Sequence, residues 1–194
     1  MNVEIKTGII FGGIIITGIV FLMILFTGLD ELTITNQELG TKKAPNLVGI
    51  AHYLNTSPEE LVKRMENKVV LYDIWTYSCI NCIRTLPFIT SWDEKYSEQG
   101  LLIVGIHSPE FEFEKDPQNV EIAIEKYGIT YPVVMDNDMK TWKAFENNYW
   151  PRKYIADHEG NLRYDHIGEG SYQETEKIIQ QLLDERSIAL DLDN

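Results

Sequence analysis

The two cysteines of the chain, Cys79 and Cys82, are separated by two residues in the segment Cys79-Ile80-Asn81-Cys82. At the first turn of a helix, free backbone N–H groups and the positive end of the helix dipole stabilise a thiolate. We therefore predict that Cys79 is a nucleophile. Cys82 lies one turn along on the same side, where it can attack a mixed disulfide formed on Cys79. The pair would alternate between dithiol and disulfide, and we expect no cofactor beyond this redox-active pair.

The same spacing also occurs in half of many zinc sites, which need two further cysteine or histidine ligands. The histidines of the chain are His52, His107, His158 and His166. None of them forms a closely spaced His-x-x-x-His pair, so we predict no metal site.

Peroxide reduction is a second alternative, because Thr76 lies three residues before Cys79, as in the Thr-x-x-Cys element of peroxiredoxins. However, position 72 is a tyrosine where that family has proline. A second cysteine three residues after the first is also a poor match for the usual peroxidase plan. We keep thiol peroxidase activity as an alternative function.

The elements that must position the pair begin with the β-rich apolar run Val69–Trp75, which predicts a buried strand. An apolar-periodic segment from Cys79 to about Glu98 predicts a helix that starts at the pair. Before the strand, Ser57-Pro58-Glu59-Glu60 combines an N-cap serine, a first-turn proline and a glutamate three residues after the cap, which predicts a helix ending near Glu66.

The rest of the chain continues this alternation of strands and helices. We expect further strands at 101–106, 131–135, 152–156 and 162–167 and further helices at 120–127 and 173–183. The last two strands are joined by a turn-rich link short enough for a hairpin. Parallel units followed by an antiparallel hairpin predict an α/β fold with a mixed central sheet and helices on both faces.

The segment Asp73-Ile74-Trp75-Thr76-Tyr77-Ser78-Cys79-Ile80-Asn81-Cys82 resembles the Asp-Phe-Trp-x-x-x-Cys-x-x-Cys element of thioredoxins, and Pro87 matches the kink proline of their active-site helix. It resembles more closely the TlpA-like and DipZ-type thioredoxin-like domains. Further matching pieces follow in order: His107-Ser108-Pro109-Glu110-Phe111, Tyr131-Pro132-Val133, Asp136-Asn137-Asp138, Tyr149-Trp150-Pro151 and Gly168-Glu169-Gly170. The match runs from about Ala44 to Leu183 and implies a thioredoxin-like fold and thiol–disulfide oxidoreductase activity.

The resemblance implies roles for further residues. Pro151 falls where the family has a cis-proline facing the cysteine pair; the alternative is a trans proline that starts an edge strand. Asp73 falls where thioredoxins keep a buried acid. Burial would raise its pKa and let it accept the proton of Cys82, unless it is merely exposed near a strand edge. Trp75 and Trp150 are expected to flank the pair as apolar, substrate-binding walls.

The run Gly8–Leu29 carries no charge and as a helix would span about 33 Å, enough to cross a bilayer. It is too long for a signal peptide and lacks a cleavage site of the Ala-x-Ala kind. Lys6 precedes it and Asp30 and Glu31 follow, which favours a cytoplasmic N-terminus with the domain outside. We therefore predict a tail (1–7), a transmembrane anchor (8–29), a tether (30–45) and a thioredoxin-like domain (46–194).

The composition argues against nucleic-acid binding, because 30 Asp and Glu residues outnumber 17 Lys and Arg and the net charge is −13. No basic stripe is present to neutralise phosphates. The segment from Glu110 to Asp116 alternates acidic residues with Phe111 and Phe113 and lacks the pattern of a calcium loop, so we interpret it as a solvated insert.

We therefore predict a membrane-anchored thiol–disulfide oxidoreductase that reduces or isomerises protein disulfides outside the cytoplasm. DipZ-type proteins usually attach this domain to a multi-span electron-carrying module, whereas a single anchor is predicted here. The expected partners are extracytoplasmic protein disulfides and a CcdA/DsbD-like membrane electron donor. A non-catalytic thioredoxin-fold binding module is the third alternative.

Overall fold

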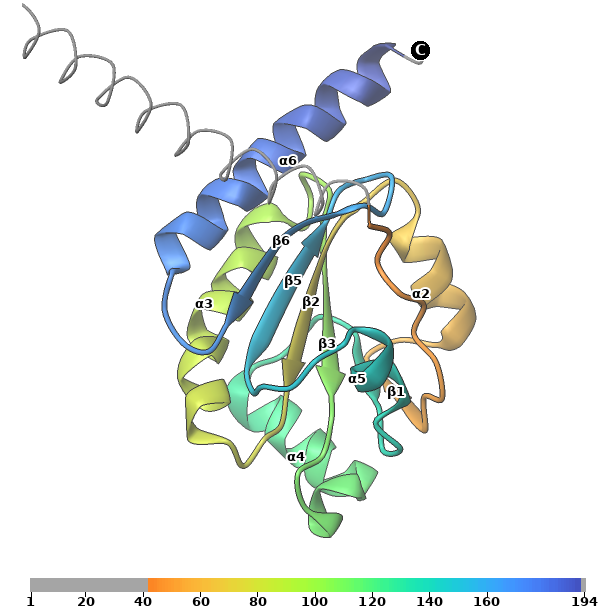
Figure 1. Ribbon diagram of the computed structural model, residues 1–194, viewed down its shortest axis with the longest axis vertical. Coiled ribbons are helices and arrows are strands. Elements are labelled where there is room, and N and C mark those ends of the chain that lie inside the picture. Colours follow the sequence, from red (N-terminus) through yellow and green to blue (C-terminus); the bar gives the residue numbers. More distant parts are fainter. Residues whose placement is uncertain (1–41, 193–194) are drawn as a thin grey trace, which may run out of the picture. The chain divides into compact units, whose positions relative to one another are not determined.

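Six strands form one mixed sheet within residues 42–192, the part of the chain that this computed structural model describes. The strands are β1 (His52–Leu54), β2 (Val69–Trp75), β3 (Leu101–His107), β4 (Val133–Met135), β5 (Arg152–Ala156) and β6 (Leu162–Ile167). Their order is β1-β4-β3-β2-β5-β6, with β2 near the middle of the sheet (Figure 1). Because β2 is parallel to β3 and antiparallel to β5, the strand that leads to the cysteines is held along both edges.

Helices cover both faces of this sheet, and the predicted α/β fold is confirmed (Figure 1). The helices are α2 (Pro58–Met65), α3 (Ile80–Tyr96), the 3-10 turn η1 (Glu112–Lys115), α4 (Pro117–Tyr127), α5 (Lys140–Ala144) and α6 (Tyr172–Leu192). One apolar cluster joins Leu71 and Trp75 of β2 to α3, α4 and α6, and a second joins Ile74 to α2 and α5. Successive side chains of a strand point to opposite faces, so Asp73 lies on the α3 side.

Capping residues determine where helices α2 and α4 begin, and the absence of helix-breaking residues lets α6 continue. The side chain of Ser57 accepts a hydrogen bond from the Glu60 N–H at 3.2 Å, so α2 begins at its predicted cap. Helix α4 begins at Pro117, earlier than the apolar period predicts, because Asp116 caps it by accepting from the Gln118 N–H at 2.9 Å. Helix α6 runs nine residues past its predicted end near position 183 because the sequence there contains no proline or glycine to stop it.

Three short elements were not predicted. β1 has three residues, η1 has four and α5 has five, all below the length at which a hydrophobic period can be recognised. β1 pairs antiparallel with β4, so it caps one edge of the sheet.

The predicted tail (1–7), anchor (8–29) and most of the tether (30–45) lie outside the described residues. Within residues 42–192 there is no helix with the length and apolar character needed to span a bilayer.

Candidate active site

Cys79 lies where β2 gives way to α3. It occupies the N-cap of the helix with an extended backbone (φ −72°, ψ 115°), and its carbonyl accepts from the Ile83 N–H at 3.0 Å. Its own N–H donates to the Thr76 carbonyl at 3.3 Å, which closes the turn between strand and helix. The side chain is partly exposed, so a substrate disulfide can reach the sulfur. This is the position that the strand, pair and helix pattern predicts.

Cys82 lies one turn further along α3 with none of its surface exposed. The two thiols are free, and the Cys79 side chain and the Thr76 backbone are the polar groups that act on the Cys82 sulfur. Burial raises the pKa of Cys82 far above the ordinary value of a thiol, and the neighbouring Cys79 raises it further. The pair is therefore asymmetric: one sulfur faces solvent, and the other needs a base before it can attack.

Asp73 is a buried acid on the same face of the sheet as Cys82, and it has no exposed surface. Burial raises the pKa of Asp73 to about 6, although the charge of Lys153 lowers it in part. Among the described residues, no hydrogen-bond partner reaches either carboxylate oxygen. An uncommitted carboxylate with a pKa near neutrality is suited to accept a proton.

Lys153 is directly opposite Asp73 in the β2–β5 ladder and is also fully buried. Its Nζ donates to the Gly168 carbonyl at 3.2 Å. Burial lowers the pKa of Lys153, whereas the charges of Asp73 and Cys82 raise it. Sequence reasoning did not find this residue, because nothing within the segment Arg152–Ala156 alone shows that the lysine is buried opposite Asp73.

The peptide bond between Trp150 and Pro151 is cis, as the resemblance implies. Because Ile74 pairs with Arg152, Pro151 lies level with the end of β2, where the Cys79 loop leaves the sheet. The indole N–H of Trp150 donates to the Ser108 carbonyl at 2.9 Å, and its ring packs on Trp142 with the centroids 4.1 Å apart. Trp150 keeps some exposed surface.

Trp75 has no exposed surface and packs in the cluster that contains Cys82. Its ring meets that of His107 edge-on with the centroids 5.4 Å apart. In this position Trp75 forms the inner wall behind the pair and cannot contact a substrate at the surface, so we assign it to packing.

Glu114 corrects the interpretation of the segment 110–116 as a solvated insert, because its side chain is fully buried against the active-site loop. It accepts from the hydroxyls of Thr76 and Ser78 at 2.5 and 2.6 Å. The insert is therefore part of the site. The two phenylalanines beside it, Phe111 and Phe113, are exposed and stack on each other with the centroids 5.5 Å apart.

The hydroxyl of Thr76 bears on the peroxidase alternative. Thr76 is fully buried and its hydroxyl proton is donated to Glu114, not toward Cys79. A threonine that assists a peroxidatic cysteine must direct its hydroxyl to that sulfur or to the peroxide. The geometry therefore favours disulfide exchange over peroxide chemistry.

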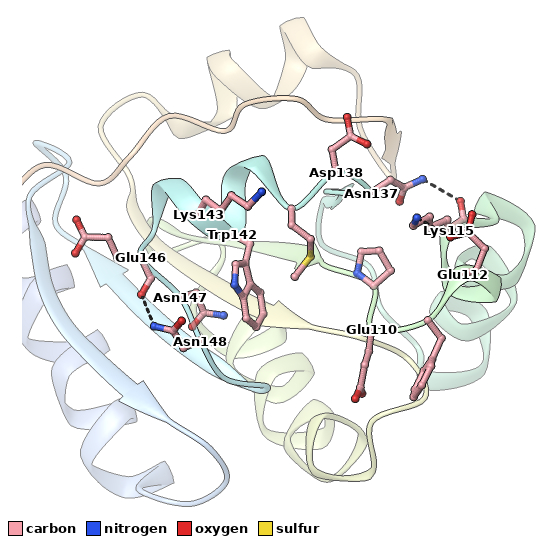
Figure 2. A pocket seen from close by; sticks show the side chains of 13 residues that line it. Glu110, Glu112, Lys115, Asn137, Asp138, Trp142, Lys143, Glu146, Asn147 and Asn148 are labelled. Carbon is pink, nitrogen blue, oxygen red and sulfur yellow. Dashed lines mark hydrogen bonds and ion pairs between the residues drawn. The ribbon is translucent and has the colours of Figure 1, made fainter.

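A groove of about 840 Å³ opens beside the insert (Figure 2). Its walls are the insert on one side and the segment from Asn137 to Asn148 on the other, and Trp142 points into it. Neither cysteine lines it.

Within residues 42–192 no group of three or more His, Cys, Asp or Glu side chains is arranged to hold a metal ion.

Residues 40–183 match the family model described as Redoxin. The chain belongs to the redoxin family. This redoxin domain is 32% identical over 143 residues to the thiol-disulfide oxidoreductase YkuV of Bacillus subtilis, covering 73% of this chain and 94% of YkuV. A solved structure, described as the solution structure of a thioredoxin-like protein in the oxidised form, matches with a TM-score of 0.65 and 30% identity over 74% of this chain and 96% of that one.

The redoxin domain is also similar to part of the protein DipZ of Mycobacterium tuberculosis, with 39% identity over 184 residues. That match covers 94% of this chain but 26% of DipZ, so the chain spans about a quarter of the length of that relative. The predicted TlpA-like, thioredoxin-like family is confirmed. The predicted enzyme class is the one that the name of YkuV states.

Proposed function

We propose that the domain is a thiol–disulfide oxidoreductase that reduces, or isomerises, disulfides of other proteins through Cys79 and Cys82. The observation that carries this proposal is the asymmetry of the pair, with Cys79 partly exposed at the N-cap of α3 and Cys82 fully buried behind it. The relationship to YkuV supports the same reaction class.

The reaction proceeds in two exchange steps. The Cys79 thiolate attacks one sulfur of the substrate disulfide, forming a mixed disulfide and releasing the other substrate sulfur as a thiolate. Cys82 then loses its proton to Asp73 and attacks the Cys79 sulfur, which releases the second substrate sulfur. Two electrons have moved to the substrate, and the domain holds the Cys79–Cys82 disulfide. Trp150 and Pro151 are proposed to hold the substrate chain beside Cys79.

The reduction potential tests the proposed direction. Equilibration of residues 42–192 with glutathione buffers should give a potential between about −270 and −200 mV, the range of reductants of this kind. Ile80-Asn81 between the cysteines lacks the Pro-His pair associated with strongly oxidising relatives, which is the basis for this expectation. A potential near about −120 mV would contradict the reductase direction. A pair that catalyses no reduction of insulin by dithiothreitol would instead support the binding-module alternative.

We further propose that Gly8–Leu29 anchors the chain in a membrane with the N-terminus cytoplasmic and the catalytic domain extracytoplasmic. The support is the length of the uncharged run and the charges that flank it. The partners would be extracytoplasmic protein disulfides and a CcdA/DsbD-like membrane donor that re-reduces the pair.

Protease accessibility tests this topology. Protease added outside intact cells, after any outer layer is permeabilised, should cut within the tether (30–45) and release a soluble fragment of the domain. The reason is that a polar tether outside the bilayer is open to cleavage. Full protection of the domain until the membrane itself is lysed would contradict the proposed orientation.

A further inference from the structure

Glu114 is a buried carboxylate with an unusual set of partners. Its residue has no exposed surface, although it lies on a four-residue 3-10 turn between β3 and α4. Oε1 accepts from the hydroxyls of Thr76 and Ser78, and Oε2 accepts from the N–H groups of Glu110 and Phe111 at 2.6 and 2.9 Å.

These partners fix the protonation state of Glu114. Four donors converge on two oxygens within the described part of the chain, and the two backbone N–H groups can only donate. A carboxylate that accepts this many bonds is stabilised in its charged form. Burial acts in the opposite direction, but the hydrogen bonds prevail and the pKa of Glu114 lies below its usual range.

The insert that carries this charge holds the whole loop that leads to the nucleophile. Thr76 and Ser78 bond Glu114, and the hydroxyl of Tyr77 donates to the Phe113 carbonyl at 3.2 Å. The next residue is Cys79. Glu114 therefore places a full negative charge beside the loop, joined to the residue before the nucleophile by one short hydrogen bond.

His107 supplies no compensating charge. Its Nε2 lies 3.3 Å from the Thr76 hydroxyl, whose proton is already donated to Glu114, so Nε2 must be the donor and carry the hydrogen. Burial lowers the pKa of His107 to about 4, and the ring is neutral at pH 7. Within residues 42–192 no lysine or arginine forms an ion pair with Glu114.

We propose that Glu114 is a positioning residue whose negative charge makes the Cys79–Cys82 pair more reducing. The inference deepens the proposed function and rests on it. Reduction of the disulfide by two glutathione molecules gives the dithiol and one glutathione disulfide, and formation of the reactive Cys79 thiolate from this dithiol releases a proton to solvent. A nearby negative charge destabilises this thiolate and therefore favours the disulfide form, whereas stabilising the reduced form makes a pair more oxidising.

Glu114→Gln tests the charge with little change of shape. We expect it to shift the equilibrium with glutathione toward the dithiol by about tenfold, which corresponds to a potential about 30 mV less negative. The matched control is Glu112→Gln, which removes one charge from the same insert at a side chain that is 86% exposed and paired with Lys115. The control should change the equilibrium less than twofold. Alkylation of Cys79 by iodoacetamide at fixed pH should be faster in Glu114→Gln, since the thiolate is the reactive form.

Ser78→Ala separates the charge from the loop geometry. It removes a donor from Glu114 but keeps the carboxylate, so the potential should stay unchanged or become more negative. A less negative potential in Ser78→Ala, or an unchanged one in folded Glu114→Gln, would overturn the inference while leaving the proposed function intact. If Glu114→Gln fails to fold, Ser78→Ala decides: a less negative potential contradicts the inference, and an unchanged or more negative potential supports it. If the wild-type pair does not exchange with glutathione at all, the proposed function fails and the inference fails with it.

Discussion

Cys82→Ala, expressed in cells as the full chain, should accumulate mixed disulfides between Cys79 and its partners. Exchange passes through a covalent intermediate on the attacking sulfur, and this variant lacks the thiol that resolves it. The exposure of Cys79 allows the first step, and the chain contains no third cysteine that could resolve the product. The adducts should appear as high-mass bands that collapse on addition of a thiol, and mass spectrometry should identify both substrates and the electron donor.

Cys79→Ala is the matched control for this trapping experiment. Cys82 has no exposed surface, and its raised pKa keeps it protonated, so it should form at least about tenfold fewer adducts. Equal trapping by both variants would show that either sulfur can attack first. If the trapped partners are newly exported reduced proteins, the domain oxidises its substrates and does not reduce them. The assignment as a thiol–disulfide oxidoreductase would still hold.

Asp73→Asn should leave the attack by Cys79 largely unchanged and slow the release of the mixed disulfide by at least about tenfold. General base catalysis contributes about 10²–10⁴-fold in such steps, and Asp73 is the uncommitted base on the Cys82 side of the sheet. Stopped-flow fluorescence with a model disulfide separates the two steps. If both rates match the wild type, Asp73 has a structural role only.

The same substitution should change how stability depends on pH. Folding raises the pKa of Asp73 to about 6 from 3.8, so between these values the folded state holds a proton that the unfolded state releases. The contribution of Asp73 to the free energy of unfolding should therefore fall as pH rises from about 4 to about 6 and then level off. Asp73→Asn should remove this fall and be more stable at pH 8 by about 2 kcal/mol, allowing for the partner that Lys153 loses.

Urea unfolding of both proteins at pH 4 and pH 8 measures this difference. Asp138→Asn is a suitable control, because that carboxylate is exposed and paired with Lys140. The control should not remove the fall between pH 4 and pH 6. If the free energy of unfolding changes equally between pH 4 and pH 8 in the wild type and in Asp73→Asn, ionisation of Asp73 does not destabilise the folded state.

Much of the fold could be predicted from the sequence because its signals are local. The buried run Val69–Trp75, the serine cap at Ser57 and the Cys79–Cys82 spacing each act over a few residues, and all three elements form where the sequence places them. The hairpin strands 152–156 and 162–167 were located with the help of the turn-rich link between them.

The parts of the site that were missed depend on partners far away in the chain. Glu114 looks like any other acidic residue of an alternating segment, and its burial is recognisable only from its packing beside Thr76 and Ser78, which lie 38 and 36 residues earlier. Lys153 is likewise recognisable as a residue of the site only when β5 is paired with β2, because this pairing places it opposite Asp73. Burial of charge is a property of the folded contacts, which a single sequence does not display.

The position of Lys153 opposite Asp73 in the β2–β5 ladder bears on how the proposed base would be restored after each turnover. In the proposed mechanism Asp73 becomes neutral when it takes the proton of Cys82, and the buried ammonium of Lys153 then lacks the opposing charge. An unpaired buried cation is costly, so this state favours prompt loss of the proton from Asp73. The charge of Lys153 would therefore shorten the lifetime of protonated Asp73 and restore the carboxylate before the next substrate binds.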